Sequence, residues 1–423
     1  MVRLLEYQGK ALLKTVAVLV PKGEVASTAQ EAKAIAGRLG KAVMVKAQVP
    51  VTGRYKEGGI GSADTPAEAE DVAGRILTSN IKGFAVRKIL VEEKLDAISQ
   101  FYAGIIVDDS YKVKAPVLMF ATEGGVDVEQ VAAEHPERVR RAAIDPLAQP
   151  SLDDIKKEVA SLAISSALTD RLGQIVFGVY QIFREYDARS VEVNPIVVTS
   201  SGMAYAADCR IVLDEAAVMR HPEFGIDFPR EIGRAPTDLE KRAWKIEEKD
   251  FRGIAYFIQM ATEINPGEGY VGFHGIGGGG AMIGADALIR HGLKLANYAD
   301  TSGNPTASKV YRIIKTIFSQ PNIDGYVLMG PVIANQEQWH HAHALVRALR
   351  EELTSRPDFP VVILIAGNKE HESIEIIKQG LSGLPARVEI FGRDYVYNVD
   401  YVAQRMKTLV TEYNALERRN VGG

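Results

Sequence analysis

The sequence is poor in cysteine. Cys209 is the only cysteine among the 423 residues, so no disulfide can form within the chain. Disulfide frameworks belong to oxidising compartments, and a chain without one is typical of a reduced compartment. We therefore interpret Cys209 as a buried, inert thiol and expect a cytoplasmic protein.

Long apolar runs are also missing. No stretch approaches the roughly 18–20 consecutive apolar residues that a membrane-spanning helix requires. The N-terminal segment, MVRLLEYQGKALLKT, has no apolar core of the signal-peptide kind. Both observations predict a cytoplasmic chain with no membrane partner.

An excess of charge of one sign is absent as well. The 50 Lys and Arg residues nearly balance the 54 Asp and Glu residues, and they form no basic run or stripe. Binding to a phosphate backbone needs such a basic footprint, so nucleic acid is not an expected partner. With 46% apolar and 25% charged residues, the composition is that of an ordinary globular protein.

What the sequence does contain is alternating helical and strand patterns. A length of 423 residues exceeds one ordinary core, which predicts two or three α/β domains. Near the start, Ser27 or Thr28 caps a helix that Gly40 ends, and an apolar strand follows at 43–45. Further strands are expected at 88–92, 100–107, 117–121, 190–198 and 203–207, with a long helical region over about 152–186.

A charged, proline-bearing segment at 215–250 is typical of a surface linker, so we place a domain boundary there and predict domains at 1–240 and 241–423. Beyond it, each apolar strand is followed by a helical pattern. This alternation predicts a doubly wound parallel sheet. Its strands are expected at 269–273, 325–329, 360–365 and 386–391.

Two segments of the first domain could bind a nucleotide. Lys46 ends a strand, and the turn after it contains Gly53 and Arg54, which suits a phosphate chain because glycine amides can approach it and cations neutralise it. Asn194 and Asp208 each follow a strand and offer hard oxygen ligands for Mg²⁺. A glycine hairpin and an Asn-Pro turn are the structural alternatives, which spacing alone leaves open.

Two loops of the second domain follow strands. The glycine-rich segment HGIGGGGAMIGAD, residues 274–286, could present amides and a helix N-terminus to an anion, or could simply form a tight turn. It does not match a dinucleotide fingerprint. In the other loop, Asn335 is expected to cap a helix with Gln338 three residues later. The histidines that follow, at 340, 341 and 343, do not form a pattern that predicts zinc.

In chain order these segments resemble the β subunit of succinyl-CoA synthetase and the corresponding part of ATP-citrate lyase. The resemblance covers nearly the whole chain and rests on LLEYQGKALL, VMVKAQV, ILVEE, ATEGGVDVEQV, VEVNPIVVT and AADCR. It implies an α/β chain with an ATP-grasp domain followed by a flavodoxin-like, doubly wound ligase domain. It also implies an ATP-dependent acid–CoA ligase that works through a phosphohistidine on a CoA-binding α-type partner.

The resemblance implies residue roles as well. Contacts to ATP are implied for Lys46, Gly53, Arg54 and Glu92; Mg²⁺ ligation for Asn194 and Asp208; and steadying of the visiting phosphohistidine for Glu192. The partner's Gly-His-Ala-Gly-Ala segment is absent from this chain, so we expect half of an enzyme. Gln100 stands where the family has a glutamate near the nucleotide, which leaves ATP or GTP open. Pro50-Val51-Thr52 likewise replaces a His-Ala-Gly run.

The second domain resembles the citrate branch of the family, ATP-citrate lyase, through LANYADTSGNP, IANQ and EIFG. Without a citryl-CoA-cleaving domain, the chain is similar to the large subunit of a citryl-CoA synthetase. Because loops at the carboxyl ends of neighbouring strands form a crevice in doubly wound sheets, we expect citrate to bind between Ser302-Gly303 and Ala334-Asn335. Val332 and Glu337 depart from the lyase pattern, and Ala366 or Gly367 stands where the lyase has a citrate-gripping arginine. Succinate, malate and a non-catalytic nucleotide-sensing subunit therefore stay open as alternatives.

Overall fold

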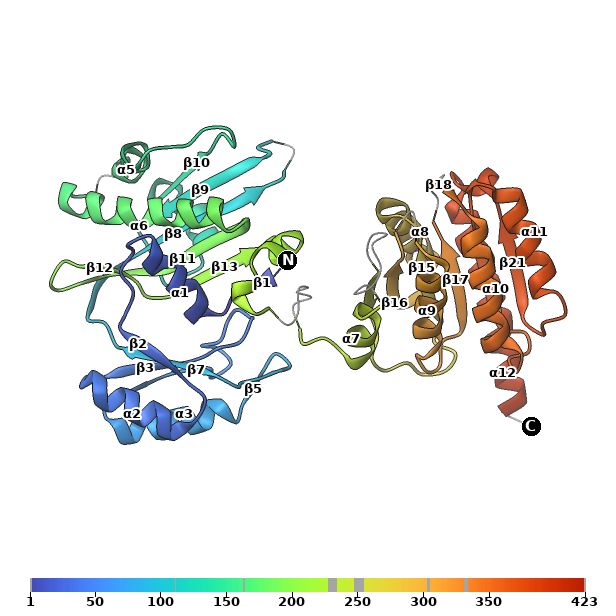
Figure 1. Ribbon diagram of the computed structural model, residues 1–423, viewed down its shortest axis with the longest axis horizontal. Helices are drawn as coiled ribbons and strands as arrows, with labels where there is room; N and C mark the ends of the chain where they lie inside the picture. The colour runs from blue at the N-terminus through green and yellow to red at the C-terminus, as the bar shows by residue number, and fades with distance from the viewer. Residues whose placement is uncertain are drawn as a thin grey trace. The chain divides into compact units, whose positions relative to one another are not determined.

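The computed structural model describes residues 2–110, 112–162, 164–226, 234–246, 255–302, 305–330 and 334–421. The chain divides into two compact units, Met1–Ala235 and Pro236–Gly423 (Figure 1). The boundary expected after residue 240 lies within helix α7 (Asp238–Trp244) of the second unit. Within the described ranges, no helix combines the length and the apolar character needed to cross a bilayer.

The larger sheet of the first unit is antiparallel and has seven strands. Helix α6 (Ser166–Glu185) lies across it and buries a stripe that includes Leu172, Val176 and Val179, spaced as one helical face. Helix α1 (Glu6–Thr15) packs against β13. The strands, in spatial order, are β1 (Val2–Arg3), β13 (Cys209–Leu213), β11 (Ala188–Thr199), β8 (Ala97–Asp108), β9 (Ala115–Ala121) and β10 (Val139–Ala143), with β12 (Ala204–Ala206) beside β11.

A second, four-stranded antiparallel sheet is covered by helices α2 (Ala29–Leu39) and α3 (Pro66–Leu77). The expected caps of α2 are confirmed: the Thr28 side chain accepts a hydrogen bond from the amide of Glu31, and Gly40 ends the helix in the left-handed conformation. The strands, in order, are β2 (Gly23–Ala26), β7 (Ile89–Glu93), β3 (Val43–Ala47) and β4 (Ile60–Ala63).

The helical region expected at 152–186 is two helices, because α5 (Leu152–Ala160) ends before α6 begins. Ser165 stands at the N-cap position of α6 with a non-helical ψ of 145° and no capping hydrogen bond from its side chain, so the backbone starts a new helix at a position that the apolar period does not reveal. The remaining short elements of this unit are β5 (Asn80–Ile81), β6 (Phe84–Ala85), α4 (Val128–Glu134) and the 3-10 helices η1 (Pro136–Arg138), η2 (Glu215–Arg220) and η3 (Pro222–Phe224).

The second unit is a six-stranded sheet in which five strands are parallel and β14 pairs antiparallel at one edge. In chain order the parallel strands follow the 2-1-3-4-5 arrangement of flavodoxin-like folds. The strands, in spatial order, are β14 (Tyr256–Gln259), β16 (Lys294–Asp300), β15 (Tyr270–Gly275), β17 (Gly325–Met329), β19 (Pro360–Leu364) and β21 (Arg387–Phe391).

Helices cover both faces of this sheet, as a doubly wound fold requires. One core cluster contains residues of α8 (Gly278–Arg290) and α12 (Val399–Val421). The cluster on the other face contains residues of α9 (Ala307–Phe318), α10 (Trp339–Leu353) and α11 (Glu370–Leu381). A separate two-stranded ribbon, β18 (Ala334–Glu337) with β20 (Gly367–Asn368), lies beyond the ends of β17 and β19.

Candidate active site

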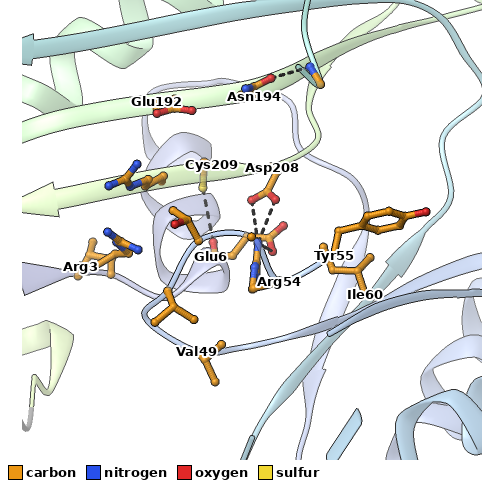
Figure 2. A pocket seen from close by; sticks show the side chains of 16 residues that line it. Arg3, Glu6, Val49, Arg54, Tyr55, Ile60, Glu192, Asn194, Asp208 and Cys209 are labelled. Carbon is orange, nitrogen blue, oxygen red and sulfur yellow. Dashed lines mark hydrogen bonds and ion pairs between the residues drawn. The ribbon is translucent and has the colours of Figure 1, made fainter. Parts of the chain in front are cut away.

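A cavity of about 340 Å³ opens in the first unit where the loop after β3 faces the strands β11 and β13 (Figure 2). Its polar wall combines side chains from segments that are far apart in the sequence. Five residues expected from the sequence line it: Gly53, Arg54, Glu192, Asn194 and Asp208.

Two other expected residues, Lys46 and Glu92, lie behind this wall. The Lys46 Nζ is 2.9 Å from Glu6 Oε1 and 2.8 Å from Glu92 Oε1, and it donates to the carbonyl of Ala207 at 2.8 Å. Glu92 is only 2% exposed. Its carboxylate therefore fixes the ammonium of Lys46. Lys46 is in turn ion-paired with Glu6, which lines the cavity.

Glu6 is the functional residue that the sequence reasoning missed. Its carboxylate is 2.8 Å from Lys10 Nζ, 2.9 Å from Lys46 Nζ and 2.8 Å from Arg54 Nη2. A Glu–Lys pair four residues apart at a helix start usually indicates a solvated face. Here both side chains are buried, so one carboxylate at the start of α1 organises three cations.

Electrostatics keep this cluster ionised. Burial would raise the pKa of Glu6, but Lys10, Lys46 and Arg54 outweigh it and hold that pKa well below its ordinary value. Burial would likewise lower the pKa of Lys46, but Glu6 and Glu92 raise it. Lys46 and Arg54 therefore stay protonated at neutral pH, each paired with carboxylates of the chain, and protonated Lys and Arg side chains are the ones that bind phosphates.

Asp208 lines the cavity, and its side chain is 27% exposed. Arg54 Nη2 donates to both of its oxygens, at 2.9 and 3.2 Å, and so bridges Asp208 to Glu6 (Figure 2). Burial by the surrounding protein and the charge of Glu6 raise the pKa of Asp208. Arg54 is thus ion-paired with the expected metal ligand.

Asn194 lies on the same side of the cavity. Its Oδ1 accepts from the amide of Gly125 at 2.6 Å, and its Nδ2 donates to the carbonyl of Val126 at 3.2 Å. A carbonyl oxygen has a second lone pair, so Asn194 and Asp208 together offer the hard oxygen donors that Mg²⁺ prefers. Among the described residues no group of three or more His, Cys, Asp or Glu side chains forms a metal site, and Mg²⁺ commonly takes one or two carboxylates plus substrate phosphates.

Glu192 precedes Asn194 on β11 and lines the cavity. Burial raises its pKa, which nearby Arg210 and a hydrogen bond from Asn194 partly offset. A carboxylate with a raised pKa beside a phosphate-sized cavity can accept a hydrogen bond from an incoming imidazole. The single cysteine, Cys209, is buried as expected, and burial raises the pKa of its thiol.

In the second unit, the glycine-rich loop already holds an anion of the chain itself. The Asp300 carboxylate accepts from the amides of Gly277 at 3.1 Å and Gly278 at 2.7 Å, at the start of α8. It also accepts from the amide of Ser302 at 2.8 Å, and Ser302 has a left-handed φ of 68°. Asp300 therefore ties the glycine loop to the expected substrate loop, whose Gly303 lies outside the described residues.

His274 is fully buried. Its Nδ1 lies 2.8 Å from the hydroxyl of Tyr326, and its Nε2 lies 3.1 Å from the hydroxyl of Thr301. Burial, with a smaller effect of His341, lowers its pKa to about 3. A neutral imidazole engaged through both nitrogens is a structural group that fixes Thr301 next to Ser302.

The prediction that Asn335 caps a helix is wrong. Ala334 and Asn335 belong to strand β18, which pairs in parallel with β20 through Ala334 and Gly367, and α10 begins only after Gln338. Pairing with a strand distant in sequence overrides the local capping pattern. The structure describes the backbone of Ala334 and Asn335 but not their side chains, and Val332 lies outside the described residues.

Comparison with protein families gives one match for each unit. Residues 3–198 match the ATP-grasp domain family. Residues 244–404 match the family described as ATP citrate lyase citrate-binding.

Relatives match across most of the chain. The succinate–CoA ligase (GDP-forming) subunit beta of Thermus thermophilus is 38% identical over 88% of this chain and 92% of its own. The corresponding ADP-forming subunit of Halobacterium salinarum is 34% identical over 90% of this chain and 94% of its own.

Solved structures support the fold of the whole chain. ATP citrate lyase from Methanothrix soehngenii matches with a TM-score of 0.73 and 17% identity, over 95% of this chain and 99% of that chain. ATP citrate lyase of Methanosaeta concilii matches with a TM-score of 0.70 at 17% identity, over 93% and 96% of the two chains. The expected ATP-grasp and flavodoxin-like folds are confirmed, and the chain belongs to the succinate–CoA ligase β-subunit family of ATP-dependent acid–thiol ligases.

Proposed function

We propose that this chain is the nucleotide-binding subunit of a citryl-CoA synthetase, which converts citrate, coenzyme A and ATP into citryl-CoA, ADP and phosphate. The observation that carries the proposal is the match of residues 244–404 to the citrate-binding family of ATP citrate lyase. An acid–thiol ligase whose carboxylate-binding unit is of the citrate type should take citrate as its acid.

The first unit performs the energy-coupling half of the reaction. Lys46 and Arg54 neutralise the phosphates, and the amide of Gly53 lets them approach. Asp208 and Asn194 would hold Mg²⁺, which neutralises charge between phosphate oxygens when bound. When the nucleotide draws Arg54 toward its phosphates, the oxygens of Asp208 become free for the metal.

The phosphoryl group leaves ATP for a histidine nitrogen of an α-type, CoA-binding partner, and Glu192 accepts a hydrogen bond from that imidazole. A citrate carboxylate oxygen then attacks the phosphorus, the P–N bond breaks, and citryl phosphate forms. The thiolate of coenzyme A attacks the acyl carbon and expels phosphate. Covalent relay replaces one difficult step by easier ones.

The second candidate is a succinyl-CoA or malyl-CoA synthetase subunit. It is favoured by the names of the relatives, which are succinate–CoA ligases at 34–38% identity. The two readings share the nucleotide site and the partner and differ only in the acid.

The test is to combine the chain with its α-type partner and to supply ATP, Mg²⁺, coenzyme A and one acid at a time. Mass spectrometry identifies the thioester. We expect citryl-CoA from citrate, and no thioester when the partner is omitted. Thioester from succinate or malate but none from citrate would reject the citrate assignment in favour of the second candidate.

A further inference from the structure

Two neighbouring rows of the antiparallel ladder face the cavity of the first unit. In one row Asn194 lies opposite Asp208, whose carbonyl accepts a hydrogen bond from the Asn194 amide at 3.1 Å. Two residues away on each strand, Glu192 of β11 pairs in register with Arg210 of β13. All four residues line the cavity. Side chains two residues apart on a strand point to the same face, so the second row lies roughly 7 Å from the first.

Arg210 differs from Lys46 and Arg54, the two cations that the sequence singled out. Lys46 and Arg54 are each ion-paired with carboxylates of the chain. Over the residues that the structure describes, the Arg210 guanidinium forms no ion pair or hydrogen bond, and its Nε is buried without a partner. Buried donors are almost always paired in folded proteins, so this one indicates a place for a partner that the chain does not supply.

Arg210 and Glu192 also leave each other unpaired. Directly opposed side chains of opposite charge stabilise a sheet when they meet. Here the charge of Arg210 lowers the pKa of Glu192, against the larger effect of burial, yet the two side chains form no ion pair. A group placed between them can accept hydrogen bonds from the guanidinium and donate one to the carboxylate. A phosphoryl group on an imidazole has both properties.

The order of the two rows indicates which part of ATP meets Arg210. Asp208 and Asn194 would hold Mg²⁺ between the last two phosphates. Glu192, in the next row, is the residue expected to meet the imidazole that receives the terminal phosphoryl group (Figure 2). Arg210 therefore lies where that group is transferred. A guanidinium matches two phosphate oxygens at once, and an arginine stabilises the charge that spreads over them during transfer.

We propose that Arg210 binds the terminal phosphoryl group of ATP and stabilises its charge as it passes to the partner's imidazole. In this step the imidazole nitrogen forms a bond to phosphorus, the bond from phosphorus to the bridging oxygen breaks, and ADP leaves with that electron pair. The proposal rests on the phosphohistidine relay of the proposed function, and it does not depend on which acid is used.

Nucleotide binding to the full-length chain tests the contact without partner or turnover. Titration calorimetry in the presence of Mg²⁺ compares ADP with a non-hydrolysable ATP analogue whose last two phosphates are joined through nitrogen. Arg210→Gln should weaken binding of the analogue roughly 10- to 100-fold, because a charged hydrogen-bonding partner is lost, and binding of ADP by less than about threefold. Arg189→Gln is the matched control, since Arg189 lies exposed on β11 outside the cavity lining, and it should change neither affinity.

Arg210→Lys keeps the charge without the planar fork. It should bind the analogue with intermediate affinity, and it serves if the glutamine variant does not fold. A folded Arg210→Gln chain that binds the analogue as tightly as wild type would overturn the proposal. Equal losses for ADP and the analogue would do the same, because Arg210 would then contact a different phosphate.

The rate of phosphoryl transfer is a second measurement. In the complex with the α-type partner and saturating ATP, Arg210→Gln should phosphorylate the partner at least roughly 100-fold more slowly than wild type or Arg189→Gln. An unchanged rate would overturn the role of Arg210 and leave the proposed function standing. A wild-type complex that binds ATP but never phosphorylates the partner would overturn the proposed relay itself, whereas failure to use citrate would leave Arg210 unaffected.

Discussion

At the scale of single residues, Glu6 joins the three cations beside the nucleotide cavity. Replacing it by glutamine keeps the shape but leaves Lys10, Lys46 and Arg54 without their common counter-ion. Breaking a buried ion pair on one side typically costs about 3–5 kcal/mol. We expect Glu6→Gln to lower the unfolding free energy of the first unit by that order, measured by hydrogen exchange of peptides from α1 and β3.

The control for this prediction is Glu24→Gln, in the same unit. Glu24 and its partner Arg38 are both more than half exposed, so their ion pair should contribute about 0–1 kcal/mol. Equal effects of the two substitutions would show that Glu6 does not organise the cluster.

A second residue-scale prediction concerns Asp208. Asp208→Asn removes the charge that pairs with Arg54 and that would bind Mg²⁺, and should lower ATP-dependent phosphorylation of the partner by orders of magnitude. The transfer of radiolabelled phosphate from ATP to the partner's histidine measures this phosphorylation. Asp214→Asn is matched to it, since Asp214 follows the other end of β13 and asparagine can cap η2 (Glu215–Arg220) equally well. Full phosphorylation in Asp208→Asn would reassign Asp208 to a structural role.

Turn and metal-ligand chemistry in the sequence singled out Gly53, Arg54 and Asp208, and the structure brings these three residues together at one cavity. Glu6 and Lys10 escaped because a pair four residues apart looks the same on a solvated helix as on a buried one. Only the tertiary contacts with Lys46 distinguish the two cases.

At the scale of elements, local patterns predicted strands and helices well where the periodicity of apolar residues determines the secondary structure. Strand β17 occupies 325–329 as expected, and the other expected strands differ from the observed ones by a few residues, whereas strands such as β13 and β16 were not expected. The pattern failed at Asn335, where pairing of β18 with β20 prevailed, and it did not indicate that the Asp300 carboxylate accepts hydrogen bonds from the amides of the glycine loop. Both outcomes depend on residues distant in sequence, which no local window contains.

Strand β15 also yields a pH prediction. His274 has a pKa of about 3 in the folded chain, against 6.5 ordinarily, because it is buried. Between these values the unfolded chain binds a proton that the folded chain does not, so stability is lost as pH falls from about 6.5 toward 3. Each such histidine contributes a slope of about 1.4 kcal/mol per pH unit.

We expect His274→Gln to reduce the slope of unfolding free energy against pH by the amount that corresponds to about one bound proton. Denaturant unfolding followed by tryptophan fluorescence measures the stability of the second unit alone, since both tryptophans, Trp244 and Trp339, belong to that unit. His371→Gln, at an exposed position in the same unit, should leave the slope as it is. An identical slope in wild type and His274→Gln would contradict the buried neutral imidazole.

At the scale of the whole molecule, the chain joins a unit of the ATP-grasp family to a unit of the family described as ATP citrate lyase citrate-binding. The alternation of strands and helices after residue 255 was enough to predict the second fold, because a parallel sheet needs a crossover helix between strands. The first fold could be named only through its resemblance to a family. The acid substrate is the one property that neither the fold nor the family settles, since relatives and unit type point to different acids.

An internal competition addresses that property most directly. The complex with the α-type partner receives equal concentrations of citrate, succinate and malate in one reaction, and the ratio of the three CoA thioesters gives the ratio of their kcat/KM values. We expect citryl-CoA to exceed the other two together by at least roughly tenfold, a difference of about 1.4 kcal/mol in transition-state stabilisation. Succinyl-CoA or malyl-CoA in excess over citryl-CoA would contradict the account.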